Sequence, residues 1–410
     1  MKSNIKRFIA FWLLFSFLFS ILNNATSLTE KRLVDFYKLP RNSIDVIFIG
    51  NSHNYCAFQP QLIDDIVPIN SYIIGGGGDS IILSYYELKE VLLYQHPQLV
   101  VLETYTLNLY DKSTTEITYY SFLDSGRWSV NKTTGFIDNV SLDKLYTYFP
   151  GLRTRMRWES PQIYIKETVN LTKNLFSSTI DPGIGVDLQT DVISEYDFSN
   201  EKRITVDEYP SPSPEILEYL EKIRQLCIKN NVQLAFVTVP MVNQPQCIDC
   251  GYAPFDIENY AVEHQIPLFT FDPALFNHLH FVDFEHVNSF GSVIVSTQIA
   301  EDVAELLNLP INKDALRYYQ KFIFSDYSIS TENGNHTLLL LPMTTDSRLE
   351  YNWSVVDESS GEVVSQEGGV NHNSISFILP HAGEYEVKVV IREPSGDFEL
   401  SAIFPVAFED

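Results

Sequence analysis

The stretch Asp45-Val46-Ile47-Phe48-Ile49-Gly50-Asn51-Ser52-His53 decides the fold. It opens with an apolar run, as expected for a strand that is buried on both faces of a parallel sheet. The glycine permits a tight exit, which leaves Ser52 exposed at the end of the strand. Two further apolar runs, 69–74 and 98–103, have the same character, and the intervening residues 84–94 have helical spacing. This alternation predicts an α/β domain with a parallel sheet covered on both faces.

The middle of the chain continues the pattern after an irregular region. Residues from about 106 to 210 are rich in Tyr, Thr, Ser and Asn, and we interpret them as an insertion over the carboxyl ends of the strands, where α/β folds place ligands. An amphipathic helix follows at 215–230, then strands at 233–239 and 267–271, and a helix at 288–307. We therefore assign residues 42–310 to one α/β domain.

The last part of the chain has a different pattern. Short β-type runs separated by Gly and Pro turns begin near residue 320 and predict a small all-β sandwich over 320–410. The phrase His381-Ala382-Gly383-Glu384-Tyr385-Glu386-Val387-Lys388-Val389 is typical of an immunoglobulin-like or fibronectin-like strand entry. The expected strands are 336–341, 351–356, 374–379, 384–391 and 398–404.

The N-terminus carries a topogenic signal. Lys2, Lys6 and Arg7 precede an apolar run from Phe8 to Leu22, which is the pattern of a basic region before a hydrophobic core. The run is short for a membrane span of roughly 20 residues. Residues 1–27 are therefore either a cleaved signal peptide or an N-terminal membrane anchor. Both alternatives export the rest of the chain, which is either tethered to the outer side of the cell membrane or secreted or periplasmic.

The charge balance excludes one class of partner. With 53 acidic and 28 basic residues the formal net charge is −25. Nucleic-acid binding depends on Lys and Arg that neutralise phosphates, so we expect no nucleic-acid partner. The densest basic stretch is Arg153-Thr154-Arg155-Met156-Arg157, which we interpret as a solvated surface, with a functional role as the alternative.

The four cysteines do not form a recognisable metal or disulfide framework. Cys56 and Cys227 are isolated, whereas Cys247 and Cys250 have the spacing of half a zinc site or a redox pair. The chain has no second Cys-x-x-Cys, which a four-thiolate zinc site needs. We expect a local disulfide at this pair, with two inert thiols as the alternative, and we expect neither a metal nor a cofactor.

Two motifs that lie far apart in the sequence contain the residue types needed to activate a serine as a nucleophile. A serine hydroxyl is a weak nucleophile and needs a base that is itself oriented by a third group. Late in the chain, Asp283-Phe284-Glu285-His286 supplies both from one turn: His286 would accept the Ser52 proton, and Asp283 would hold the imidazole. An oxyanion also needs donors, and the backbone N–H of Ser52 is one candidate. The glycine loop Gly75-Gly76-Gly77-Gly78-Asp79-Ser80 is expected to supply a second.

These blocks together resemble the SGNH/GDSL hydrolase family. The serine block after the first strand matches Ser52, the second block matches Gly78 in Gly78-Asp79-Ser80, and the last block matches Asp283 and His286. The resemblance covers about residues 45–307, without the insertion. It implies a flavodoxin-like three-layer domain, a catalytic Ser52 and an oxyanion amide at Gly78.

The third block departs from the family pattern. Where the family has Gly-x-x-Asn after the third strand, this chain reads Glu103-Thr104-Tyr105-Thr106-Leu107-Asn108, without the glycine. Asn108 is therefore only a candidate third donor. His53 and Glu103 are candidates for contact with substrate, with structural roles as the alternative.

The form of the first block narrows the resemblance further. Gly50-Asn51-Ser52-His53 is similar to the membrane-anchored branch linked to cell-envelope acylation, which includes proteins of teichoic-acid D-alanylation and polysaccharide O-acetylation. This implies an exported serine esterase or O-acyltransferase that uses an acyl-serine intermediate on a cell-surface glycan, with a membrane-bound O-acyltransferase as possible partner. The rival hypothesis is a non-catalytic assembly or glycan-binding protein of the cell envelope.

Overall fold

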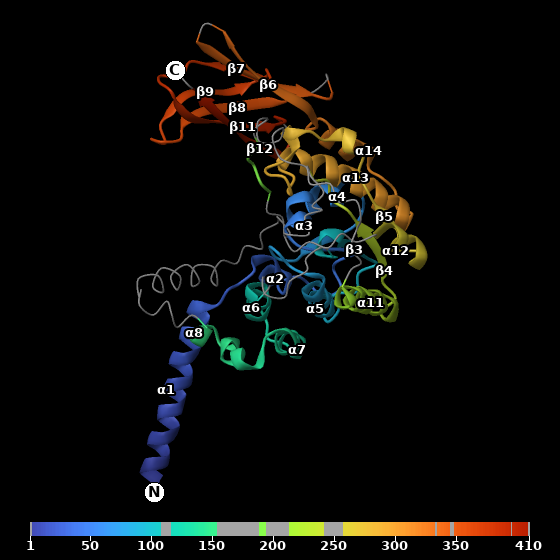
Figure 1. Ribbon diagram of the computed structural model, residues 1–410, viewed down its shortest axis with the longest axis vertical. Coiled ribbons are helices and arrows are strands. Elements are labelled where there is room, and N and C mark those ends of the chain that lie inside the picture. Colours follow the sequence, from blue (N-terminus) through green and yellow to red (C-terminus); the bar gives the residue numbers. More distant parts are fainter. Residues whose placement is uncertain are drawn as a thin grey trace.

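The computed structural model describes residues 2–107, 116–153, 188–193, 213–241, 257–332, 334–344, 348–394 and 396–408. Figure 1 shows three parts: a long N-terminal helix, an α/β body, and a C-terminal β region at the end of the molecule far from the N-terminus. The helix α1 (Lys2–Thr26) contains an exposed stretch, Ile5–Asn23, that is long and apolar enough to cross a membrane. A signal sequence has the same properties, so both N-terminal alternatives remain open.

The body is built on one parallel sheet. Its five strands lie in the order β2-β1-β3-β4-β5, and every pair is parallel. This 2-1-3-4-5 order is that of the flavodoxin-like doubly wound fold. The predicted α/β architecture is thus confirmed. The strands are β1 (Val46–Ile49), β2 (Ser71–Ile74), β3 (Leu99–Glu103), β4 (Gln233–Val237) and β5 (Leu268–Phe269).

Both faces of the sheet are buried because the strand side chains alternate between two cores. Val46 and Phe48 of β1 enter one core, whereas Ile47 and Ile49 enter the other, and all four are 0% exposed. The first core is covered by α3 (Ser52–Ala57), α4 (Pro60–Ile66) and α13 (Ser289–Leu307). The second is covered by α2 (Lys31–Phe36), α5 (Ile81–Val91), α11 (Pro214–Lys229) and α12 (Ile257–His264). These helices complete the three layers.

The helical elements in the described part of the insertion are η1 (Thr104–Leu107), α6 (Glu116–Asp124), α7 (Val130–Asn139), η3 (Leu142–Tyr148) and α8 (Pro150–Arg153). Helix α6 borders the glycine loop after β2, since both line one cavity. Helix α7 instead packs on α5, where Tyr86 Oη donates to Asp138 at 2.7 Å. Figure 1 shows α8 beside the body-side end of α1. The part of the insertion up to Arg153 therefore extends toward the N-terminal helix. Residues 188–193 lie elsewhere, against the C-terminal region, where the Val192 N–H donates to the carbonyl of Ile403 at 2.9 Å.

One expectation for this region is wrong. Arg153 is not a solvated residue: its side chain is 7% exposed and bonds both oxygens of Asp124, at 2.8 and 3.2 Å. Its guanidinium also lies 4.0 Å from the centre of the Tyr120 ring. Burial is tolerated because the carboxylate and the ring replace water around the cation. Arg155 and Arg157 lie outside the described residues, as do Cys247 and Cys250, whereas Cys56 and Cys227 are buried free thiols.

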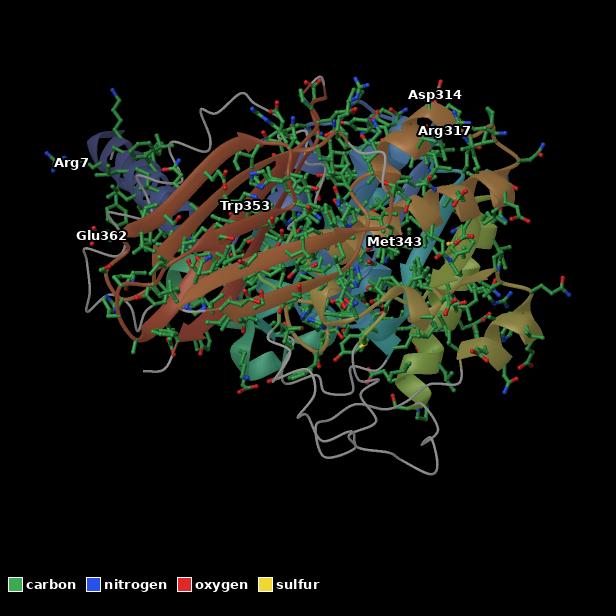
Figure 2. The ribbon with its side chains drawn as sticks, turned by 90° about the horizontal axis from the view of Figure 1, so that it is seen from above. Arg7, Asp314, Arg317, Met343, Trp353 and Glu362 are labelled. Atoms are coloured by element: carbon green, nitrogen blue, oxygen red, sulfur yellow. The ribbon has the colours of Figure 1, made fainter. Side chains whose placement is uncertain are left out.

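The C-terminal region consists of two antiparallel sheets, consistent with the expected immunoglobulin-like sandwich. The sheet orders are β10-β7-β6 and β12-β11-β8-β9, and Figure 2 places the buried Trp353 among these strands. Helix α14 (Lys313–Gln320) leads from the body into this region. The strands are β6 (Phe324–Glu332), β7 (Asn335–Pro342), β8 (Glu350–Asp357), β9 (Val363–Val370), β10 (Ser374–Phe377), β11 (Gly383–Arg392) and β12 (Glu399–Phe408).

Two of these strands, β6 and β9, are absent from the prediction. Both are edge strands with at most one buried residue each, so neither has the clear alternation of apolar residues that marks a half-buried strand. The C-terminal region packs against the body. Its apolar core and the core that α13 covers form one continuous cluster. Ser289 Oγ at the start of α13 also donates to the carbonyl of Ser401 at 2.6 Å.

Candidate active site

The structure brings together Ser52 and His286, which lie near opposite ends of the sequence of the α/β body. Ser52 is the first residue of α3, directly after the β1 exit, and the Asn51 side chain caps that helix by accepting from the His53 N–H at 3.1 Å. Ser52 Oγ lies 2.7 Å from His286 Nε2. Because the other ring nitrogen faces a carboxylate, we assign the proton to Nδ1, and the serine hydroxyl then donates to Nε2.

Asp283 completes the chain of hydrogen bonds. Each of its carboxylate oxygens lies 3.0 Å from His286 Nδ1, and Oδ1 also accepts from the backbone N–H groups of Glu285 and His286. Partial burial pushes the pKa of Asp283 upward, but these hydrogen bonds and the charge of His286 outweigh it and hold the pKa below its ordinary value. The ionised carboxylate is therefore available to orient the imidazole and to stabilise its protonated form.

The turn that carries both residues is fixed by Asn288, the N-cap of α13. Its side-chain amide donates to the carbonyls of Asp191, Leu279 and Phe281, and its oxygen accepts from the first turn of the helix. Three backbone segments thus converge on one fully buried side chain. Asn288 has the structural helix-start position that its sequence context suggests, and it holds the Asp283–His286 turn in register with Ser52.

The glycine loop lies directly against the nucleophile strand. Gly75 has φ +130°, and a Cβ there would lie 1.7 Å from the carbonyl oxygen of Gly50. Gly78 has φ +75° and is exposed. Asp79 is buried below the loop and accepts from the Gly76 N–H. The backbone of this loop therefore approaches the β1 exit as closely as glycine permits, as an oxyanion loop requires. The oxyanion role of Gly78 remains a prediction.

His53 is buried beside Ser52 and His286 rather than exposed at the surface. It is 1% exposed, stacks on the Tyr105 ring at 3.8 Å, and lies 4.8 Å from the His286 ring. Burial, with a further contribution from the charge of His286, holds the pKa of His53 well below its usual value, so the ring is neutral. Neither of its ring nitrogens has a hydrogen-bond partner within the described parts of the chain.

Glu103 lies at the end of β3, below the site. It is 1% exposed, and one carboxyl oxygen accepts from the Tyr105 N–H at 2.8 Å. Burial raises its pKa to about 8. A Cβ on Gly50 would come within 2.7 Å of the Glu103 Cβ, so this neutral acid packs directly under the exit of β1. Asn108 lies outside the described residues.

The sequence interpretation did not identify two residues, Tyr105 and Arg32, whose side chains lie next to the site. Tyr105, which follows β3, donates its hydroxyl to Glu285 at 3.1 Å and covers one face of His53. Arg32 of α2 donates to the Gly75 carbonyl at 2.8 Å and lies 3.9 Å from the Tyr55 ring centre. Their only sequence signals are a position after a strand and a local charge, which do not distinguish them from surface residues.

One group of side chains near the site has metal-ligating types. One ligand atom each of His53, Glu285 and His286 lie within 4.8 Å of one another. Both ring nitrogens of His286 are, however, engaged by Ser52 and Asp283. A metal here would compete with that hydrogen-bond chain, so the arrangement favours acid–base chemistry.

A cavity of about 190 Å³ is lined by the glycine loop and by residues of α2, α5 and α6. Burial raises the pKa of Asp79 to about 7 and that of Glu87 well above its usual range, so both acids hold a proton to higher pH than ordinary carboxyls. The nearby Glu30 instead pairs with Arg32 at 3.0 Å. The lining is Glu30, Leu33, Gly76, Gly77, Asp79, Glu87, Ile117, Thr118, Ser121 and Phe122.

Comparisons with known proteins add little to this geometry. No protein-family sequence model and no curated protein match the chain. Among solved structures, a Bacteroides fragilis protein with an acylhydrolase assignment aligns over 66% of this chain and 93% of its own, with 13% identity and a TM-score of 0.32. An immunoglobulin-like sandwich protein from Bacteroides vulgatus aligns over 20% of this chain and 82% of its own, with 21% identity and a TM-score of 0.15. The PKD1 domain of Vibrio anguillarum Epp covers 20% and 89%, with 18% identity and a TM-score of 0.16. Because these scores are low, the fold assignment rests on the strand order.

Proposed function

We propose that this protein is an exported serine esterase or O-acyltransferase that works through an acyl-Ser52 intermediate. The observation that carries the proposal is the continuous chain of contacts from Ser52 Oγ to His286, 2.7 Å, and from His286 to Asp283, 3.0 Å. A nucleophile, its base and the orienter of that base are the minimum set for acyl transfer by serine.

The first half-reaction would form the acyl-enzyme. Ser52 Oγ attacks the ester carbonyl carbon while its proton passes to His286 Nε2, and Asp283 stabilises the resulting imidazolium. The Ser52 N–H and the exposed loop at Gly78 would stabilise the oxyanion. The bond from the acyl carbon to the alcohol oxygen then breaks, and that oxygen takes the proton from His286. One ester is consumed and one acyl-serine forms.

The second half-reaction decides between hydrolase and transferase. Water or an acceptor hydroxyl gives its proton to His286 and attacks the acyl-serine, and Ser52 leaves with the proton restored. We propose a cell-surface glycan as the acceptor and a membrane-bound O-acyltransferase as a source of acyl groups, on the basis of the N-terminal helix and the Gly50-Asn51-Ser52-His53 block.

Fluorophosphonate labelling with intact-mass detection tests the nucleophile, and release of 4-nitrophenol from its acetate ester tests turnover. We expect single labelling of the wild type at Ser52, and loss of both label and turnover in Ser52→Ala and His286→Ala. The control His372→Ala removes an exposed histidine of the C-terminal region and should retain both. If the folded wild type shows neither label nor turnover, the non-catalytic assembly or glycan-binding alternative replaces this proposal. An increase in acyl-glycan over free acid on addition of an oligosaccharide acceptor would identify a transferase.

A further inference from the structure

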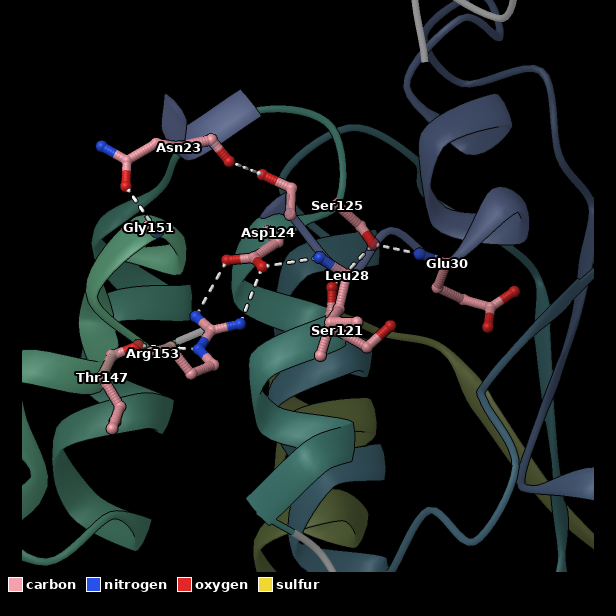
Figure 3. Close-up of polar contacts among 10 residues, drawn as sticks. Asn23, Leu28, Glu30, Ser121, Asp124, Ser125, Thr147, Gly151 and Arg153 are labelled. Carbon is pink, nitrogen blue, oxygen red and sulfur yellow. Dashed lines mark hydrogen bonds and ion pairs between the residues drawn. The ribbon is translucent and has the colours of Figure 1, made fainter. Parts of the chain in front are cut away.

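The segment 23–28, where the chain leaves α1, is attached to the body by hydrogen bonds (Figure 3). Asn23 Oδ1 accepts from the Gly151 N–H at 3.0 Å, and Ser27 Oγ donates to the Asn23 carbonyl at 2.8 Å. The Leu28 N–H donates to Asp124 at 2.9 Å, on the same carboxylate that binds the buried Arg153. The end of the helix is thus attached to α6 and α8 rather than joined to the body by a free linker.

Packing places α8 beside the last turns of the apolar helix. The Phe19 and Phe149 rings lie 5.5 Å apart, and a Cβ on Gly151 would come within 2.8 Å of Leu22. Phe19 precedes Asn23, the last residue of the span, by four residues. At about 1.5 Å per residue this is roughly 6 Å along the axis. If α1 crosses a membrane, Phe149 must therefore lie at the depth of the outer end of that span.

Phe149 belongs to a larger exposed apolar surface on the same side of the body. Trp128 is 67% exposed and donates its indole N–H to Tyr148 Oη at 2.9 Å, and the Tyr148 ring contacts Phe149 at 5.3 Å. Side-chain contacts are therefore continuous from Trp128 to Phe19 of α1. Helix α7 packs on η3, η3 on α8, and α8 on α1. We call the exposed apolar residues of this group the apolar collar, and they are Trp128, Val130, Ile137, Leu145, Tyr146 and Phe149.

We propose that the apolar collar lies in the interfacial layer of the membrane that α1 crosses, so that α7, η3 and α8 rest on the lipid surface. Trp and Tyr are enriched at this layer because their rings are apolar with one polar atom. Large apolar side chains gathered on one face mark an interaction surface. Lipid is the occupant that the contact between Phe149 and Phe19 favours, because that contact fixes the depth. The inference needs α1 to be retained and does not depend on the chemistry at Ser52.

Tryptophan quenching in bilayers tests the collar with the full chain. In a Trp12→Phe/Trp158→Phe background two tryptophans remain, Trp128 and the buried Trp353. The protein is reconstituted into phosphatidylcholine nanodiscs with or without bromine on carbons 6 and 7 of the acyl chain. We expect bromolipid to quench most of the Trp128 emission and aqueous iodide to quench it less than in detergent. The quenched component should disappear when Trp128→Phe is added.

A matched control moves the reporter to another strongly exposed apolar site away from α1. Val262 on α12 is 79% exposed, and Figure 1 shows α12 on the far side of the body. Val262→Trp combined with Trp128→Phe in the same background should report no bromolipid quenching and full iodide access. If Trp128 behaves like this control in bilayers, with α1 present by intact mass, the collar faces water or another protein and the proposal is wrong.

Discussion

Replacing Glu103 by Gln should remove a large part of the pH dependence of stability. The carboxyl is buried, and among the described residues no charged partner compensates it, so burial raises its pKa from 4.5 to about 8. Between these values the unfolded chain has lost the proton and the folded chain keeps it, so the folded state binds more protons and stability falls as pH rises. Below the unfolded-state pKa the carboxyl is protonated in both states and does not lower the stability. Above that pKa the free energy of unfolding falls progressively as the pH rises toward the folded-state pKa. Gln keeps the oxygen that accepts from Tyr105 and has no carboxyl to ionise.

The magnitude follows from the shift. With 1.36 kcal/mol per pKa unit, Glu103 lowers the free energy of unfolding by roughly 1 kcal/mol at pH 5 and roughly 3 kcal/mol at pH 7. The wild type should therefore lose about 2–3 kcal/mol more than Glu103→Gln between these two pH values. Other titrating groups are common to both proteins and cancel in the difference.

Urea unfolding of the full chain in mild detergent, followed by circular dichroism at both pH values, measures this difference. The matched control Glu362→Gln removes an exposed carboxyl in a turn of the C-terminal region and should follow the wild type. If wild type and Glu103→Gln change equally between pH 5 and pH 7, the Glu103 carboxyl is not held neutral by burial and the reasoning fails.

Three further changes have definite expected outcomes. Gly75→Ala should destabilise the body by about 3 kcal/mol or more in urea unfolding, because its Cβ would overlap the Gly50 carbonyl at positive φ, and a shift in the unfolding midpoint smaller than that of a surface Gly→Ala control would contradict this. Arg153→Met should cost about 3–5 kcal/mol, because it leaves the buried Asp124 unpaired, and adding Asp124→Leu should recover part of that loss. His280, whose pKa burial lowers to about 4, should make the wild type lose roughly 2 kcal/mol from pH 7 to pH 5, since only the unfolded chain binds the proton there; His280→Gln should show a correspondingly shallower acid slope in the same titration.

The sequence predicted the elements whose signal is local. The apolar runs of β1 and β3 and the spacing of α5 and α11 follow from side chains a few residues apart, since burial on both faces selects continuous apolar strands. The glycine loop and the Asp283–His286 turn also carry their signal within a few residues. These local patterns were enough to choose the class of fold and to nominate Ser52.

Contacts between distant segments were beyond the reach of local patterns. The Arg153 side chain was expected in solvent, because three arginines in five residues are usually solvated. Its buried position is explained by Asp124 and Tyr120, which reach it from another part of the chain. The strands β6 and β9 were missed because these two edge strands have few buried residues, unlike the edge strands β10 and β12. The attachment of α1 to α8 has no sequence pattern at all, since it depends on Phe149 and Gly151 reaching α1 across the fold.

By itself, the sequence determined which side chains are chemically able to act: a serine after a buried strand, a histidine with an aspartate three residues before it, and a loop of glycines. Tertiary structure decided that Ser52 and His286, 234 residues apart, lie 2.7 Å from each other. It also decided that His53 and Glu103 are buried and neutral beside them. The physical reason is that residue type sets the ordinary pKa and the possible hydrogen bonds, whereas distance and desolvation, which control reactivity, arise only when the sheet brings its strand ends together.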